Sequence, residues 1–169
     1  MSNVKLLYGR GELSVDLPET SDVTLIRKPS MPRLVDPSLA VESTLSNPTA
    51  SAVLKTHTKN AKTACILICD ITRPVPNSLI LRPIIRKLMT LGIQLEQITV
   101  LIATGLHRPN EDKELEELIG DPWVLENAKV ENHFARDDSA HIEVGTTKKG
   151  NRILLDRRFV DADVKIVTG

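Results

Sequence analysis

Uninterrupted apolar runs alternate with segments of helical periodicity from residue 61 to the end of the chain. Two runs, 64–69 and 98–103, are typical of strands buried on both faces of a parallel sheet. Between them, residues 77–91 carry apolar side chains at helical spacing, and Gly92 is placed to end that helix. This alternation predicts an α/β fold with a mostly parallel, Rossmann-like sheet flanked by helices.

The same pattern continues toward the C-terminal end. It predicts a helix over residues 110–119 and a third parallel strand over residues 129–133. A small antiparallel hairpin of residues 142–147 and 152–155 follows, and residues 164–167 form a last strand. Asn110 is placed to cap the helix of residues 110–119. Pro83 falls inside the helical pattern of residues 77–91, which indicates either a kink or a main helix that starts near Arg82.

The first 60 residues follow a different pattern. Residues 5–17 predict an antiparallel hairpin around a glycine turn, and residues 23–26 predict another short strand. A proline-punctuated passage follows, with a short helix after Asp36 that ends before Pro48. We therefore expect residues 1–60 to form a hairpin and a wrapping arm of the same domain whose α/β core is residues 61–169.

Composition narrows the class of protein. The 169 residues suffice for about one domain, and 22 basic residues balance 22 acidic ones, so a nucleic-acid partner is not expected. Aromatic residues make up only 2% of the chain, which leaves few platforms for stacking bases. No apolar run reaches the roughly 18 residues of a membrane span, and the start lacks the apolar stretch of a signal peptide. The sequence thus predicts a soluble, cytoplasmic protein without a membrane partner.

Both cysteines lie in one predicted strand. Cys65 and Cys69 are four residues apart, about 13 Å along a strand, whereas a disulfide needs Cα atoms within about 7 Å. The same separation prevents both from binding one metal ion. We expect two reduced thiols that pack as small apolar side chains.

Candidate chemistry gathers where the predicted strands end, and ligands of open α/β sheets bind at that edge. Arg73 follows the first strand and precedes a helix whose first turn carries no acid. A guanidinium beside unpaired helix N-terminal amides suits a phosphate or carboxylate. The alternative is a structural Arg73 that pairs with Asp70 and shapes the proline-rich turn.

Histidines supply the second candidate group. His107 follows a Thr-Gly turn at a loop tip, where it either acts as a general acid or base or merely caps and packs. His133 reads as structural, and His57 and His141 as surface or hydrogen-bonded positions. A zinc site of His107, His133 and Asp137 has only weak support, because no helix-borne ligand pair accompanies it. No nucleoside-triphosphate or dinucleotide loop motif is present.

Several motifs together resemble one known family. They are Asp70-Ile71-Thr72-Arg73-Pro74, then Thr104-Gly105-Leu106-His107-Arg108-Pro109, then Asn132-His133 with Asp137, and Gly145-Thr146-Thr147 with Gly150. In this order and spacing, the chain from Tyr8 to Gly169 resembles the N-terminal domain of the nickel-dependent lactate racemase family.

The resemblance implies a 2-hydroxy acid racemase or epimerase that uses a nickel pincer, a pyridinium-3,5-bisthiocarboxylate mononucleotide holding Ni(II). In the family, hydride leaves the substrate Cα for the pincer ring while a histidine takes the hydroxyl proton. His107 matches one of two such catalytic histidines. Asp70, Ile71, Thr72 and Arg73 match the cofactor-binding turn.

The chain departs from the family in its extent. The second catalytic histidine, the lysine that holds the pincer, the nickel ligand and the C-terminal domain come later than Gly169 in the family. The resemblance therefore implies no metal ligand in this fragment, a missing C-terminal domain as partner, a fragment inactive alone, and a possible homo-oligomer. A different class stays open, namely a non-catalytic module that binds an anionic ligand or a partner domain.

Overall fold

The computed structural model describes residues 2–169, which form two compact units, residues 2–33 and residues 34–169. In the first unit, β1 (Ser2–Tyr8) pairs antiparallel with β2 (Gly11–Leu17). The turn between them uses Gly9 at φ +57°, a left-handed conformation that suits glycine. The predicted strand at 23–26 is wrong: this segment pairs with no strand, and Ile26 is 94% exposed.

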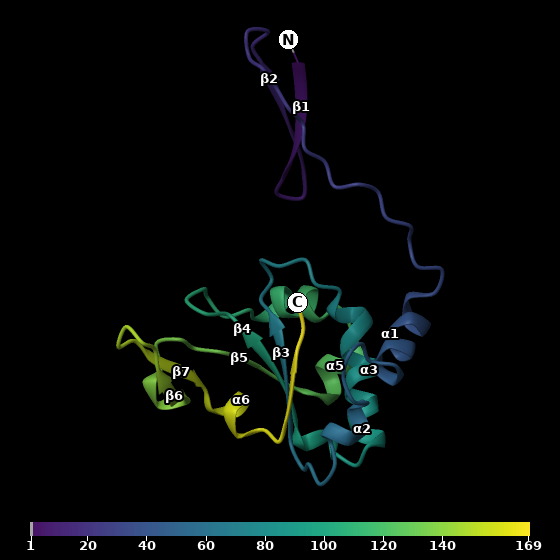
Figure 1. The fold of residues 1–169 in the computed structure, drawn as a ribbon, viewed down its shortest axis with the longest axis vertical. Helices are drawn as coiled ribbons and strands as arrows, with labels where there is room; N and C mark the ends of the chain where they lie inside the picture. The colour runs from purple at the N-terminus through teal and green to yellow at the C-terminus, as the bar shows by residue number, and fades with distance from the viewer. Residues whose placement is uncertain (1) are drawn as a thin grey trace. The chain divides into compact units, whose positions relative to one another are not determined.

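The second unit is built on a four-stranded parallel sheet (Figure 1). Its strands are β3 (Ala64–Cys69), β4 (Ile98–Ala103), β5 (Lys129–Asn132) and β8 (Val164–Val167). The spatial order β5-β4-β3-β8 is the 3-2-1-4 order of a Rossmann-type sheet, which confirms the predicted fold class. All carboxyl ends of the strands therefore lie at one edge.

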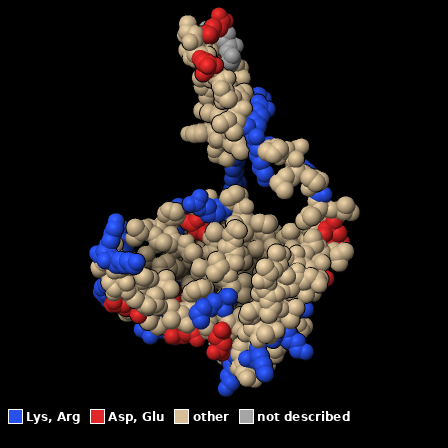
Figure 2. All heavy atoms as spheres, in the orientation of Figure 1, with Lys and Arg blue, Asp and Glu red and all other residues tan. Residues whose placement is uncertain are grey.

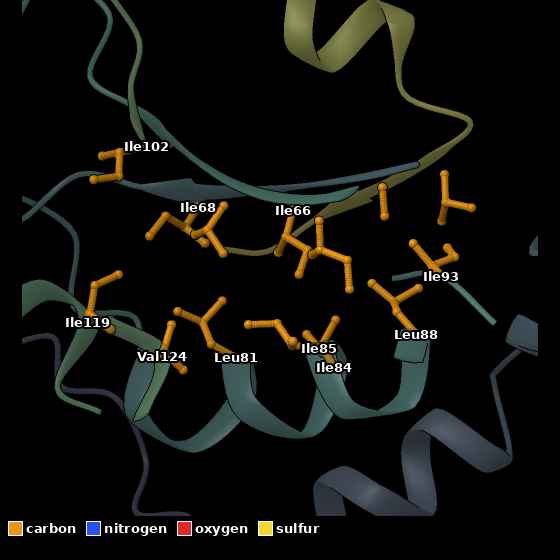
Figure 3. Close-up of a cluster of buried hydrophobic side chains, with 14 of the residues drawn as sticks. Ile66, Ile68, Leu81, Ile84, Ile85, Leu88, Ile93, Ile102, Ile119 and Val124 are labelled. Atoms are coloured by element: carbon orange, nitrogen blue, oxygen red, sulfur yellow. The ribbon is translucent and has the colours of Figure 1, made fainter. Parts of the chain in front are cut away.

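Helices cover one face of this sheet. The main one is α3 (Asn77–Thr90), followed along the chain by α4 (Asp112–Ile119) and α5 (Pro122–Asn127). Figure 3 shows Leu81, Ile85 and Leu88 of α3 facing Ile66 and Ile68 of β3, and all five side chains are fully buried. The buried members of this core are all aliphatic, and Trp123 packs against them while partly exposed.

The opposite face is covered less completely. It carries the antiparallel hairpin of β6 (His141–Thr146) and β7 (Arg152–Asp156), and α6 (Arg157–Asp161). A small cluster of Cys65, Leu101 and Ala162 is buried there, with Leu67 and Phe159 against it. Both cysteines are free as predicted, and burial raises the pKa of the Cys65 thiol to about 11.

The remaining helices are α1 (Pro37–Ser46), capped by Asp36 as expected, and α2 (Leu54–His57). Short 3-10 turns lie at Leu95–Gln97 and Asp138–Ala140. The predicted arm of residues 1–60 is divided between the two units, because residues 34–60 belong with the sheet and Leu45 packs on the core. No helix among the described residues is long and apolar enough to cross a membrane.

Several boundaries differ from the sequence-based prediction. The helix α3 runs continuously through Pro83 from Asn77, so a start near Arg82 is wrong. The helix predicted at 110–119 begins at Asp112 instead, and Asn110 does not cap it. The hydrophobic pattern did not indicate α2, α5 and α6, each of which is six residues or shorter. The Asp121-Pro122 pair was the available signal for α5, since Asp121 caps it and Pro122 opens it.

Candidate active site at the carboxyl edge of the sheet

One polar residue directly follows each of three neighbouring strands. Asp70 follows β3, Thr104 follows β4 and His133 follows β5. Because these strands are parallel and adjacent, the three residues lie at one edge of the sheet. Asp70 and Thr104 are buried there, so their polar groups need partners within the protein.

Asp70 finds its partner in His107. The Nδ1 atom of His107 lies 2.5 Å from Oδ2 of Asp70, and the other carboxylate oxygen accepts the Thr72 hydroxyl at 2.6 Å. Burial acts to raise the pKa of Asp70, but the hydrogen bonds from Thr72 and His107 outweigh it and lower that pKa. The ionised carboxylate accepts the Nδ1 proton, which leaves Nε2 of a neutral His107 free to accept another.

The loop after β4 presents His107 to solvent. Gly105 turns the chain at φ +58°, and the His107 amide donates to the Thr104 carbonyl at 2.9 Å. The Thr104 hydroxyl in turn donates to the carbonyl of His133. The His107 side chain is consequently 60% exposed, while Asp70 behind it is 6% exposed. The ring of His107 is thus fixed through Nδ1 by Asp70, while the rest of its side chain is accessible to a ligand.

Two asparagines that the sequence analysis did not assign to the site tie its loops together. The Asn110 side chain accepts the amide of Ile71 at 3.2 Å, which joins the loops after β3 and β4. Asn132 of β5 bonds both the amide and the carbonyl of Asn110 at 2.9 Å. These three loops therefore form one hydrogen-bonded unit, and only the tertiary structure reveals the asparagines' role.

Arg73 has no such partner. Its side chain is exposed, and its guanidinium makes no hydrogen bond or ion pair within residues 2–169. The alternative of a structural Arg73–Asp70 pair is therefore wrong, because His107 and Thr72 occupy the carboxylate of Asp70. The first turn of α3 carries no acid, as expected. Its amides are less available than predicted, since Asn77 and Leu79 donate to the carbonyls of Val75 and Pro76.

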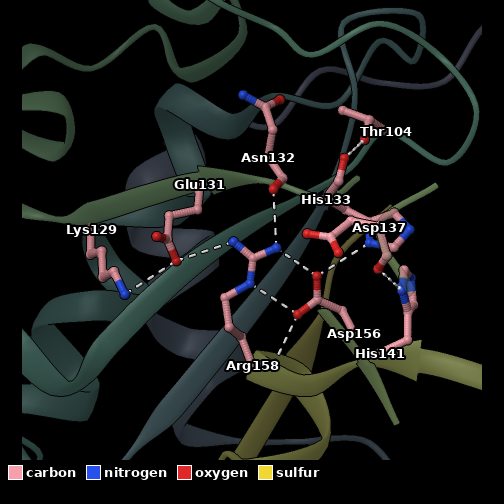
Figure 4. A network of polar contacts seen from close by, with 9 residues as sticks. All are labelled: Thr104, Lys129, Glu131, Asn132, His133, Asp137, His141, Asp156 and Arg158. Atoms are coloured by element: carbon pink, nitrogen blue, oxygen red, sulfur yellow. Dashed lines mark hydrogen bonds and ion pairs between the residues drawn. The ribbon is translucent and has the colours of Figure 1, made fainter. Parts of the chain in front are cut away.

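A second histidine–aspartate pair lies close by (Figure 4). Nδ1 of His133 is 3.2 Å from Oδ2 of Asp156, the last residue of β7. Arg158 binds the same carboxylate through Nε at 2.9 Å and also bonds the Asn132 carbonyl and Glu131. Burial opposes ionisation of Asp156, yet the bonds from Arg158 and His133 prevail and lower its pKa to about 2. His133 is thus fixed from behind, as His107 is.

The other histidines match their expected positions. The ring of His141 meets that of His133 edge-on at 5.0 Å, and its Nδ1 lies 2.7 Å from the Asp137 carbonyl. His57 is exposed on α2. The zinc hypothesis finds no support, because residues 2–169 contain no group of three or more His, Cys, Asp or Glu side chains that could hold a metal ion.

Two cavities open at this edge of the sheet. One, of about 350 Å³, is lined by residues 105–108 and 133–136, including His107 and His133. The other, of about 290 Å³, lies between the sheet and the β6–β7 hairpin and is lined mainly by aliphatic side chains and Phe159. Gly105 and His133 border both cavities. This edge of a Rossmann-type sheet carries a buried acid, Asp70, behind an exposed histidine, His107, and Arg73 follows in the same loop as Asp70. These are features of an enzyme site that binds an anion.

Comparison with known proteins agrees with this class. The family model of the lactate racemase N-terminal domain matches residues 8–169, so the chain belongs to that family. The lactate racemase of Lactiplantibacillus plantarum is 30% identical over 129 residues, which cover 76% of this chain and 30% of that protein. The lactate racemase of Thermoanaerobacterium thermosaccharolyticum is 28% identical over 171 positions, covering 100% of this chain and 40% of that protein.

Solved structures support the same fold. The lactate racemase apoprotein from Thermoanaerobacterium thermosaccharolyticum superposes with a TM-score of 0.79 at 25% identity, covering 98% of this chain and 38% of that one. A protein from Thermotoga maritima shares the fold at a TM-score of 0.55 and 19% identity, covering 78% of this chain and 32% of that one. The chain therefore spans less than half the length of these relatives.

Proposed function

We propose that this chain is the N-terminal part of a nickel-pincer-nucleotide-dependent racemase or epimerase that acts on a 2-hydroxy acid. The observation that carries the proposal is the pairing of His107 with ionised Asp70 at the carboxyl edge of the sheet, within a domain of the lactate racemase family. A racemase must move a proton on and off the substrate hydroxyl, and a histidine with a free Nε2 is suited to that work.

In this proposal His107 is the acid and base of one substrate face. Its Nε2 accepts the proton of the 2-hydroxyl group and returns it, while Asp70 keeps Nδ1 protonated and the ring oriented. Asp70 also stabilises the imidazolium that forms when Nε2 is protonated, as the buried acid of a catalytic triad does. Asn110 and Asn132 keep the loop of His107 in register with the loop of Asp70.

The residues present fit the nucleotide end of the cofactor rather than its metal. When bound, the nickel pincer supplies the hydride acceptor for the substrate Cα. The free guanidinium of Arg73 and the acid-free start of α3 suit a mononucleotide phosphate. Thr72 and Ile71 would line that turn. The described residues contain no group of three or more His, Cys, Asp or Glu side chains that could hold a metal ion, and the proposal assigns no nickel ligand to them.

The proposal is tested with a chimera. Residues 1–169 replace the matching segment of the Thermoanaerobacterium thermosaccharolyticum lactate racemase, and racemisation of 2-hydroxy acids is measured by chiral chromatography. We expect turnover by the chimera and none by the 169-residue chain alone, since the chain spans 40% of that relative. His107→Gln should lower turnover by about 10²- to 10⁴-fold without loss of bound nickel. His57→Gln is the matched control and should change little.

Two outcomes would contradict the proposal. Racemisation by the isolated chain above a protein-free control would show that the partner segments are not needed. A chimera that folds, retains nickel and keeps full activity with His107→Gln would remove His107 from proton transfer.

We further propose a cytoplasmic location, because a reducing compartment preserves free thiols such as Cys65 and Cys69.

A further inference from the structure

The two cavities beside His107 differ in chemistry although they share a border. In the 350 Å³ cavity the ionisable lining residues are His107, His133, Arg108 and Arg136, with no acid among them. Arg108 is paired with Glu114, whereas the Arg136 side chain has no hydrogen-bonding partner within residues 2–169. This cavity, which we call the basic cavity, suits a carboxylate and a neighbouring hydroxyl group.

The 290 Å³ cavity, which we call the apolar cavity, is almost free of charge. Five large apolar side chains line most of it, namely Leu67, Leu101, Leu154, Leu155 and Phe159. The other lining residues are Ala103, Gly105, His133 and Asp156. The one acid, Asp156, is paired with Arg158 and is in hydrogen-bond contact with His133. Figure 2 shows a hollow between the hairpin lobe and the sheet, with mostly uncharged surface around it and basic side chains at the outer end of the hairpin lobe.

The size of the apolar cavity exceeds what lactate needs. The cavity is open to solvent and has a volume of about 290 Å³, so it has room for a side chain larger than the methyl group of lactate. Leu154 and Leu155 face this space while 38% and 41% exposed, so they are apolar groups that a ligand could still cover. Gly105 and His133 border both cavities, so the two cavities adjoin at these residues.

We propose that the substrate is a 2-hydroxy acid with a branched aliphatic or aromatic side chain. Its carboxylate and hydroxyl occupy the basic cavity near His107, and its side chain occupies the apolar cavity. His133, fixed by Asp156, lies at the junction and donates or accepts a hydrogen bond at the substrate's polar end. The inference rests on the proposed function, from which it takes the hydroxy acid, and it adds the class of side chain.

The test measures binding to the 169-residue chain by calorimetry and by histidine ring NMR. The probes are lactate, 2-hydroxy-4-methylpentanoate and 3-phenyllactate. One methylene in an apolar pocket changes binding by roughly 10- to 200-fold. We therefore expect the two larger acids to bind at least about tenfold more tightly than lactate. His107 and His133 resonances should shift together on binding, with His57 as the internal control.

Matched substitutions locate the side chain. Ala103→Phe fills the apolar cavity and should abolish the advantage of 3-phenyllactate over lactate. Ala135→Phe narrows the basic cavity, so it should weaken all three acids and keep their ratio. Leu155→Asn, at a partly exposed position, provides a second test should Ala103→Phe fail to fold, and it should lower the same ratio.

The outcomes separate this inference from the proposed function. If lactate binds as tightly as the larger acids, or if His107 shifts without His133, the side-chain inference is overturned while the proposed function stands. If none of the acids binds the 169-residue chain, the side-chain inference is overturned, whereas the proposed function is decided by the chimera. If sedimentation reveals a dimer that Leu155→Asn dissociates, a second copy covers the apolar cavity and the inference is likewise overturned.

Discussion

At the scale of single residues, the chemistry of His107 depends on what lies behind it. An exposed histidine on a loop is an unremarkable acid or base by itself, but Asp70 is buried, ionised and only 2.5 Å from its Nδ1. Thr72 holds the second carboxylate oxygen and so fixes the direction of the first. The carboxylate of Asp70 therefore sets the tautomer of the His107 ring, because it accepts the proton on Nδ1.

Replacing Asp70 by Asn tests this dependence. The amide can still bond Nδ1 as a donor, which favours the wrong tautomer and removes the charge that stabilises an imidazolium. We expect racemisation by the chimera to fall at least about 10²-fold. Long-range nitrogen–proton NMR should show the neutral His107 ring changing tautomer. Asp138→Asn, at an exposed acid in the 3-10 turn before β6, is the control; an unchanged tautomer and rate with Asp70→Asn would contradict the assignment.

Arg73 gives the second prediction at this scale. Arg73→Lys keeps the charge but loses the planar fork that binds phosphate through two bonds. Titration with nicotinamide mononucleotide, a pyridinium mononucleotide, should show binding weakened by at least about tenfold, the equivalent of roughly 1.5 kcal/mol. The melting temperature should not move, because the side chain is exposed and unpaired in the fold. A lower melting temperature with unchanged nucleotide binding would make Arg73 structural.

These residues were predictable from the sequence for a physical reason. The residues that follow a buried strand must lie at the carboxyl edge of the sheet, so Asp70 and the loop of His107 could be placed without knowing any contact. Asp156 and Arg158 could not, because they follow an antiparallel hairpin whose return path the periodicity does not determine. The Asp70–His107 bond itself also needed the structure, since the sequence pattern suggested Arg73 as the partner of Asp70.

At the scale of elements, the Asp156 network joins β5, β7 and α6. Asp156 caps α6, and Arg158 connects it to the Asn132 carbonyl of β5. Its carboxyl pKa is lowered to about 2, below the ordinary 3.8. A lowered pKa means that the folded state favours the charged form. The resulting stabilisation is therefore present above about pH 4 and is lost as the pH falls through about 2.

Asp156→Asn should expose this contribution. Asn caps helices about as well as Asp, so the substitution removes the charge and leaves the cap. We expect the free energy of unfolding at pH 7 to fall by at most about 2 kcal/mol, and the difference from wild type to vanish near pH 2. Urea unfolding at several pH values measures it. Asp161→Asn, exposed at the end of α6, should show no such pH-dependent difference; an equal effect there would refute the network's role.

At the scale of the whole molecule, the described residues form two units, and only the second has a hydrophobic core to stabilise it. Residues 34–169 contain every member of both hydrophobic clusters, and helices cover one face of the sheet. The first unit is a single two-stranded hairpin with exposed apolar side chains such as Leu7 and Tyr8. A lone two-stranded hairpin is marginally stable in water at best. The sequence could indicate the hairpin but not this division, because the contacts of α1 decide it.

Removal of residues 1–33 should consequently leave the second unit intact. Among the described residues, no side chain of the removed segment belongs to either cluster, so the core of Ile66, Ile85 and their neighbours should keep its buried area. We expect the shortened chain to melt within a few degrees of the 169-residue chain and to keep its histidine ring resonances, including those of His107 and His133. As a control, Ile85→Ala in the shortened chain should cost about 2–5 kcal/mol, the range for truncating a buried aliphatic side chain. A shortened chain that is unfolded, or whose His107 resonance has moved, would show that the first unit supports the site, and residues 34–169 would not be an independent domain.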